Sequence, residues 1–397
     1  MALAVLTVAL TLAAAVLLAA AAVLLLQVLL SFLPERAATP HAERPRLAVL
    51  MPAHDEAAGI ADTLASVRPQ LQPGDRLLVV ADNCSDDTAQ VAARCGAEVA
   101  QRRDDQRRGK GYALDFGMRR LEADPPALVV FVDADCALEP GALDRLARDC
   151  ARHQRPVQAL YLMQSPPDAG LKTRIAELAW LVKNQVRPLG WHRAGLPCQL
   201  MGTGMAFPWA QIRGAPLASG HLVEDMQLGL DLALAGAPPR FCPGARVTSL
   251  FPAQAQGLAS QRLRWEHGHL GVIASRVPRL LWHAIAHGRP QLAAMALDVG
   301  VPPLAALALM LLVAMLAGAL FAALGGGALP LALAGLGLAA LLLAVLLAWS
   351  RHGRHIVSLG ELLGAPLYVL GKIPVYTRLF KGRQVEWVRT HRDDKPH

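Results

Sequence analysis

The stretch "ALVVFVDADC", residues 127 to 136, places a run of apolar residues directly before two aspartates. Its valines and phenylalanine predict a buried strand over 127 to 132. Helical patterns near 57–68, 87–95, 109–122 and 140–153 separate this strand from similar runs, "RLAVLM" (46–51), "RLLVVA" (76–81), "AEVAQ" (97–101) and "VQALYLM" (157–163). This alternation predicts a mostly parallel α/β sheet with helices on both faces.

Acidic segments follow three of the predicted strands. The first strand runs into "PAHDE", the second into "DNCSDD" and the fourth into "DADC". One such segment is an ordinary turn or helix cap. Ligands of open α/β sheets, however, bind beyond the carboxyl ends of the strands. Three acidic ends at one edge therefore indicate a binding site.

Asp133 and Asp135 are separated by one residue, so in an extended chain their carboxylates project from the same side. Two neighbouring carboxylates repel each other unless a cation joins them. Oxygen ligands favour Mg²⁺ or Mn²⁺, which keep open positions for phosphate oxygens. The pair therefore predicts a metal-bound diphosphate.

Three further positions carry candidate chemistry. The side chain of Asp82 can accept hydrogen bonds from a base or a ribose. Lys110 lies between two glycines at a predicted helix start, which suits contact with an anion, although a solvated charge run is the alternative. Glu224 and Asp225 precede a helical stretch, where they either favour the helix dipole or supply a general base.

Membrane segments explain the 54% hydrophobic content. No charged residue occurs from Ala2 to Leu33, which predicts a membrane-spanning helix. The alternative, a signal peptide, is disfavoured because this stretch lacks the basic n-region of signal peptides. The uncharged runs Val299–Leu324 and Ala328–Trp349 predict two more spans, with Asp298 at the interface. The expected organisation is a helix over 1–33, a domain over 40–285, two helices within 292–350 and a basic tail over 351–397.

The distribution of lysine and arginine predicts the orientation. The tail from Arg351 is basic, so the positive-inside rule puts the tail and the region from Glu35 to Pro290 on the cytoplasmic side of a bacterial-type inner membrane, with the N-terminus outside. The net charge of +8 favours membrane lipids as a partner, and no nucleic-acid-binding module is visible. Residues 358 to 380 predict an interfacial amphipathic segment, or alternatively a fourth span. Six cysteines without CxxC spacing predict reduced thiols.

In this order, "PAHDE", "DNCSD", "DAD", "GTGMAF", "ED" and "QRLRW" resemble the membrane-bound branch of family 2 glycosyltransferases, which includes cellulose, hyaluronan and chito-oligosaccharide synthases. The resemblance covers most of residues 46 to 269. It implies a GT-A fold, a Rossmann-like nucleotide-sugar-binding domain. It also implies metal-dependent, inverting transfer of a hexosyl or N-acetylhexosaminyl group from a nucleotide sugar, usually UDP-linked.

The resemblance also implies residue roles. Asp225 corresponds to the catalytic base, with Glu224 beside it, and Asp133 and Asp135 correspond to the metal and diphosphate ligands. "QRLRW" matches a QxxRW motif near the diphosphate and the acceptor, although a membrane-interface arginine and tryptophan are the alternative. The other donor-binding candidates are Pro52, His54, Glu56, Asp82, Lys110, Gln261 and Arg264. The acceptor-binding candidates are Trp265, Gly202, Thr203 and Gly204.

Two departures bear on the function. Val223 stands where the family often has threonine, and the predicted spans are fewer than in polymer-extruding synthases. The sequence therefore predicts addition to a lipid-linked or saccharide acceptor in cell-surface glycan or exopolysaccharide synthesis, with a processive synthase as the alternative. A nucleotidyltransferase and a noncatalytic membrane scaffold are alternatives of another class. The first strand is not followed by the glycine-rich basic loop of a nucleotidyltransferase.

Overall fold

The computed structural model describes residues 1–35, 43–220, 223–252, 255–373 and 376, and in helix α10 it describes side chains only from residue 264 onward. The chain forms two compact units. Unit 1 contains residues 1–35, 167–195 and 269–383, and unit 2 contains 36–166, 196–268 and 384–397. This division differs from the continuous domain over 40–285 expected from the sequence.

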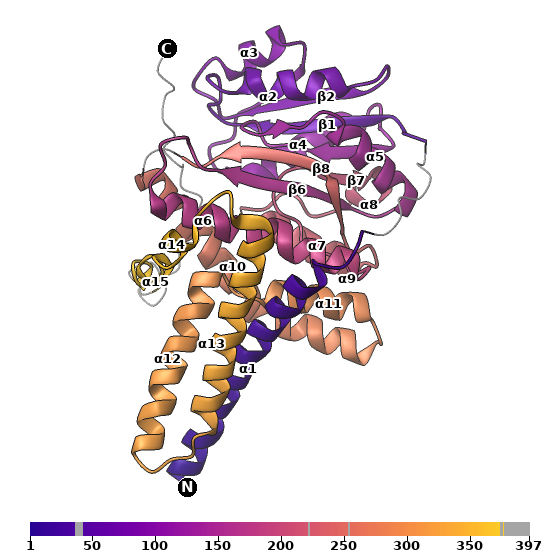
Figure 1. Ribbon diagram of the computed structural model, residues 1–397. Coiled ribbons are helices and arrows are strands. Elements are labelled where there is room, and N and C mark those ends of the chain that lie inside the picture. Colours follow the sequence, from indigo (N-terminus) through magenta and orange to yellow (C-terminus); the bar gives the residue numbers. More distant parts are fainter. Residues whose placement is uncertain (36–42, 221–222, 253–254, 374–375, 377–397) are drawn as a thin grey trace. The chain divides into compact units, whose positions relative to one another are not determined.

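Unit 2 contains an eight-stranded sheet in the order β3-β2-β1-β4-β7-β6-β8-β5 (Figure 1). Strands β1, β2, β3 and β4 are parallel neighbours, whereas β7 pairs antiparallel with both β4 and β6. The strands are β1 Leu47–Ala53, β2 Arg76–Asp82, β3 Glu98–Arg102, β4 Leu128–Phe131, β5 Ala137–Leu138, β6 Val157–Gln164, β7 Met205–Pro208 and β8 Arg240–Leu250.

Helices of unit 2 pack on this sheet. Leu50 of β1 and Phe131 of β4 share a buried cluster with Leu114 and Met118 of α4, because alternate residues of each strand face the same layer. The helices are α2 Ile60–Val67, η1 Arg68–Gln70, α3 Thr88–Arg94, α4 Lys110–Leu121, α5 Ala142–His153, α8 Trp209–Ile212 and α9 Glu224–Leu234. Helix α10, Ala255–Ala286, begins in unit 2 and ends in unit 1. The GT-A-like α/β architecture expected from the sequence is confirmed, and the sheet is mixed because β7 and β5 pair antiparallel with their neighbours.

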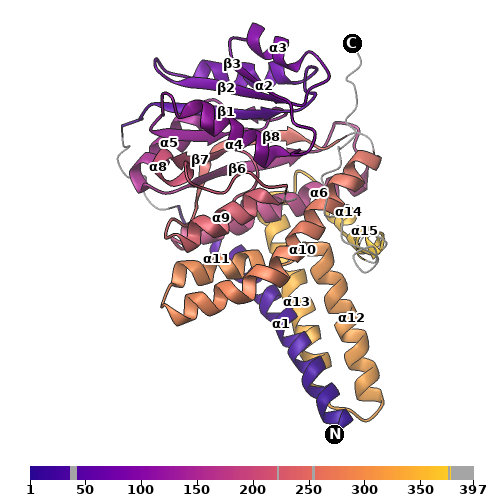
Figure 2. The same cartoon turned by 180° about the vertical axis from the view of Figure 1, so that it is seen from behind.

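Unit 1 is helical. Its long helices α1 (Ala2–Leu30), α12 (Leu304–Ala323) and α13 (Leu329–Ala348) lie side by side in both views (Figure 1 and Figure 2). Each contains a span long and apolar enough to cross a membrane, with a mean hydropathy of 2.7, so the predicted number of three is confirmed for the described residues. The shorter helices are α6 Leu171–Leu181, η2 Val182–Val186, α7 Arg187–Arg193, α11 Pro290–Gly300, η3 Trp349–Gly353, α14 Leu359–Leu362 and α15 Ala365–Leu370.

A buried polar cluster joins α1, α7 and α11 within unit 1. Arg187 Nη2 lies 3.0 Å from Asp298 Oδ1, and both side chains are at most 3% exposed. Gln27 donates to the same Asp298 oxygen over 2.7 Å and accepts from Arg187 Nε over 3.0 Å. Asp298, which the sequence shows without a partner, is thus paired with a residue 111 positions away. Its place at the membrane interface stays a prediction. Helix α1 is thus a packed part of unit 1.

We expect Asp298→Ala to destabilise unit 1 by about 3–5 kcal/mol, because it leaves the Arg187 guanidinium buried without its counter-ion. The double variant Arg187→Met/Asp298→Leu should recover most of that loss, since apolar residues replace buried ion pairs well. Thermal unfolding in detergent measures both. Glu139→Ala is the matched control because its pair with Arg246 is exposed. An unchanged melting temperature for Asp298→Ala would contradict a stabilising role of the pair.

Candidate active site

The ends of β1 and β2 are tied together around Asp82. Arg102 Nη1 donates to Asp82 Oδ1 over 2.6 Å, and His54 Nδ1 lies 2.7 Å from the Asp82 carbonyl oxygen. Burial raises the pKa of Asp82, and the hydrogen bond from Arg102 opposes that rise. The Glu56 amide donates to Thr88 Oγ1 over 2.8 Å. His54, Glu56 and Asp82 therefore lie together at the edge of the sheet where β1 and β2 end, as the sequence predicts.

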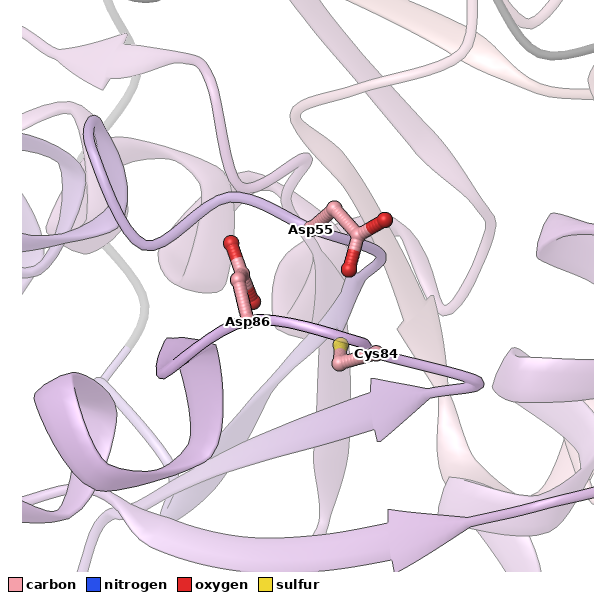
Figure 3. A group of neighbouring side chains, drawn as sticks. All are labelled: Asp55, Cys84 and Asp86. Carbon is pink, nitrogen blue, oxygen red and sulfur yellow. The ribbon is translucent and has the colours of Figure 1, made fainter.

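Asp55, Cys84 and Asp86 lie together in the loops that follow β1 and β2 and form one of two groups of candidate metal ligands among the described residues (Figure 3). The other group contains Asp133 and Asp135. The Asp55 carboxylate accepts the Ser85 amide at 2.6 Å, and the Asp86 carboxylate accepts the Ala57 amide at 3.0 Å. Burial raises the pKa of the Cys84 thiol, which disfavours the thiolate that binds metals. These carboxylates join the β1 and β2 loops and need no ion to do so.

Lys110 connects three of the predicted motifs. Its ammonium is ion-paired with Asp133 and donates to the Gly202 carbonyl oxygen over 2.6 Å. Burial lowers the pKa of Lys110, but attraction by Asp133 and Glu224 outweighs burial and raises that pKa above its ordinary value. Lys110 therefore stays cationic at the edge of β4, where an anionic ligand would meet it.

Asp133 and Asp135 are compatible with a divalent cation. Oxygens of both carboxylates lie within 4.8 Å of each other and of the Cys136 sulfur. The Asp133 amide donates to Thr203 Oγ1 over 3.0 Å, which fixes the backbone at the first carboxylate. Burial holds the pKa of Cys136 well above its usual range, so the thiol disfavours metal ligation. The remaining oxygen donors suit Mg²⁺ or Mn²⁺.

Glu224 and Asp225 form the first turn of α9, where the helix dipole favours carboxylates. The Asp225 carboxylate lies close to Gly202, since a Cβ atom at that glycine would be 3.6 Å from Asp225 Oδ2. Burial, followed by repulsion from Asp225, raises the pKa of Glu224 to about 7. Lys110, Asp133 and the Glu224–Asp225 pair thus share one site of unit 2.

The "GTG" segment shapes the floor of this site. Gly202 and Gly204 have positive φ angles of 98° and 64°, and a Cβ atom at Gly204 would lie 2.7 Å from the Ala159 side chain. Thr203 between them is fully buried and carries the hydroxyl that Asp133 contacts. The structure thus gives this segment the role of supporting Asp133 and Lys110, while its contact with an acceptor stays a prediction.

Several predicted residues are not brought to this site by any described contact. Pro52 lies half-buried within β1. Arg264 and Trp265 are half-buried on α10, and the side chain of Gln261 lies outside the description. Their roles in donor and acceptor binding stay predictions. Sequence reasoning missed Arg102, whose only signal is its place at the end of β3, next to Asp82 in the sheet register.

The family model for glycosyltransferase like family 2 matches residues 45–268. Uncharacterized glycosyltransferases of Mycobacterium bovis and Mycobacterium tuberculosis are 36% identical over 107 residues, which is 25% of this chain and 46% of each relative. The low-salt glycan biosynthesis hexosyltransferase Agl6 of Haloferax volcanii is 33% identical over 106 residues, or 26% of this chain and 24% of that protein. The chain thus spans at most about half the length of these curated relatives.

A solved structure extends the likeness of fold over both units. The mannosyltransferase of Pyrobaculum calidifontis, in complex with GDP-Man and Mn²⁺, has a TM-score of 0.54 and 20% identity. The match covers 92% of this chain and 99% of that protein. The motif order, the GT-A-like sheet and the family match over more than half of the chain agree. This protein belongs to the glycosyltransferase like family 2.

Proposed function

We propose that this protein is a metal-dependent, inverting glycosyltransferase that transfers a hexosyl or N-acetylhexosaminyl group from a nucleotide sugar, such as a UDP-sugar, to a lipid-linked or saccharide acceptor. The observation that supports this most strongly is the placement of Lys110. It contacts Asp133 and Gly202, and Asp225 lies beside the same glycine. The Lys110 ammonium, which can hold an anion, and the Asp225 carboxylate, which can act as a base, thus both lie beside Gly202.

The chemical step is a direct displacement. The acceptor hydroxyl attacks the anomeric carbon of the donor sugar and gives its proton to the Asp225 carboxylate. A new carbon–oxygen bond forms as the bond between the sugar and the diphosphate breaks, and the nucleoside diphosphate leaves with the electron pair. Lys110 stabilises the negative charge that grows on the leaving group.

Asp133 and Asp135 would hold the divalent cation. Bound there, Mg²⁺ or Mn²⁺ would neutralise the diphosphate and make it a better leaving group. Asp82, His54 and Glu56 lie where the strands β1 and β2 end, and their position is consistent with contact to the nucleoside. Arg264 and Trp265 are assigned to the diphosphate and the acceptor, respectively, from the family resemblance.

Unit 1 would hold the enzyme at the membrane. Its three apolar helices are long enough to span a bilayer, and the basic tail favours a cytoplasmic position for the active site in an inner membrane. Exposed Leu359, Leu363 and Leu367 on and beside α14 and α15 support an interfacial position of this segment. Cell-surface glycan or exopolysaccharide synthesis is the process that we infer, with membrane lipids as neighbours of the acceptor.

A screen of the purified protein against UDP- and GDP-linked sugars, with Mn²⁺ and glycoside or lipid acceptors, tests this proposal. The expected result is release of one nucleoside diphosphate for each sugar transferred, with one or a few sugars added to each acceptor. Release of pyrophosphate in a parallel assay with nucleoside triphosphates and sugar 1-phosphates would indicate a nucleotidyltransferase, and no reaction in either assay would favour a scaffold. Long polysaccharide made by this chain alone in proteoliposomes would favour the processive alternative.

A further inference from the structure

A cavity of about 210 Å³ lies beside Asp225 in unit 2. The first turns of α4 and α9 form two of its walls, and the loop over Pro216 to Ser219 forms a third. The polar groups that line it are those of Lys110, Ser219, Glu224, Asp225, Gln227 and Asp231. Asp231 therefore lies about two helical turns beyond the catalytic pair on α9 and faces the same cavity.

The loop wall is held in place by close contact with α4. A Cβ atom at Gly111 would lie 2.4 Å from the Leu217 carbonyl oxygen and 2.7 Å from the Ser219 carbonyl oxygen. Such distances leave no room for a side chain, so glycine at this position permits the loop to approach the helix. The loop is thus a built wall of the cavity.

The charges of the lining disfavour an anionic occupant. Glu224, Asp225 and Asp231 contribute three carboxyl groups, against the single ammonium of Lys110 at the end of the cavity that faces Asp133. A phosphate or carboxylate placed there would face like charges in a partly desolvated space. A neutral hydroxyl group, in contrast, can donate hydrogen bonds to carboxylates.

The volume of the cavity and the apolar residues of its lining further limit which ligands can occupy it. Leu114, Leu217 and Leu228 offer apolar contact, which suits the C–H face of a sugar ring. The volume is below the roughly 300–1,000 Å³ of pockets for drug-sized ligands, so the cavity fits a single ring. Asp133 and Asp135 are absent from the described lining, whereas Lys110 lines the cavity and contacts Asp133, so the cavity lies next to the proposed diphosphate position.

We propose that this cavity is the acceptor subsite and that it selects a neutral, hydroxyl-bearing ring, such as a pyranose, over an acceptor that bears a phosphate at that position. Asp231 is the specificity-determining residue, because its carboxylate accepts hydrogen bonds from the acceptor and repels anions. This inference rests on the proposed function and gives its acceptor a chemical class.

The test uses matched acceptors, namely octyl glycosides and their 6-phosphates, with the full-length protein in detergent. Asp231→Ala should raise the KM for the neutral glycoside about 10-fold, as expected for loss of a hydrogen bond to a charged group. The KM for the nucleotide sugar and its slow hydrolysis without acceptor should not change. Asp231→Asn should narrow the preference for the neutral glycoside over its phosphate about fivefold. Asp144→Asn on α5 is the matched control, because its carboxylate is partly exposed and pairs with Arg148.

Three results would overturn the inference. The first is a wild-type preference for the phosphorylated acceptor. The second is a change in donor KM or donor choice for the Asp231 variants, because the cavity would then hold the transferred sugar. The third is an unchanged acceptor KM in both Asp231 variants. A wild-type protein that neither transfers nor hydrolyses any nucleotide sugar would overturn the proposed function as well, so the two failures are distinguishable.

Discussion

Asp225→Asn is expected to lower kcat about 10³-fold, within the 10²- to 10⁴-fold range typical of a general base, while the KM for the nucleotide sugar stays within about threefold. An amide cannot take the proton of the acceptor hydroxyl. The substitution keeps the size of the side chain at the start of α9 and its place beside Gly202. Because the proton moves only as the new bond forms, the loss should appear in turnover rather than in donor binding.

Steady-state kinetics and titration of the nucleoside diphosphate separate these quantities for Asp225→Asn. Asp144→Asn is again the control, since it removes one partly exposed carboxylate from α5 and should change kcat by less than about twofold. Turnover of the Asp225→Asn enzyme near the wild-type rate would mean that another group takes the proton. Glu224, whose pKa is raised to about 7, would then be the next candidate.

The second large effect concerns Asp133 and Asp135. Asp133→Asn and Asp135→Asn should each weaken nucleoside diphosphate binding and lower kcat by at least about 10²-fold, because a bound metal contributes several kcal/mol to charge stabilisation. Asp133→Asn also removes the counter-ion of Lys110. Binding titrations in Mn²⁺ measure the first effect and initial rates measure the second.

Chelation tests the same metal site in the wild-type protein. Dialysis against EDTA should abolish transfer, and adding Mg²⁺ or Mn²⁺ should restore it. Asp55→Asn, in the second carboxylate group, serves as the control, because that carboxylate joins two loops through Ser85. Its metal requirement should match that of the wild type. Full activity in excess EDTA is incompatible with the role given to Asp133 and Asp135.

The four neighbouring strands β3, β2, β1 and β4 were predictable from local sequence patterns. Strands β1, β2, β3 and β4 are short apolar runs, and parallel pairing brings the ends of β1, β2 and β4 to one edge. Strands β5, β7 and β8 were not predicted. Strand β8 contains Pro243 and Gly244, and its pairing with β6 skips from Cys242 to Arg246. Such a bulge interrupts the alternation that identifies a strand in the sequence.

The candidate site was partly predictable for a similar reason. Asp133 and Asp225 belong to the "DAD" and "ED" motifs, so the sequence alone indicated them as site residues without any information about their positions in space. Arg102 and Asp231 belong to no motif. Only the sheet register places Arg102 beside Asp82, and only the turn of α9 places Asp231 on the cavity that Glu224 and Asp225 also line. Long-range partners such as Asp298 and Arg187 are likewise invisible in the sequence, because 111 residues separate them.

The anomeric configuration of the product tests the central claim, a single displacement with Asp225 as the base. The protein is incubated with the α-linked nucleotide sugar that it accepts best, and the one-bond C1–H1 coupling of the new glycosidic linkage is read by NMR. A β-linked product from the wild type, and its loss in Asp225→Asn, is the predicted result. An α-linked product would contradict direct displacement, and free sugar as the only product in the presence of acceptors would contradict transfer to an acceptor.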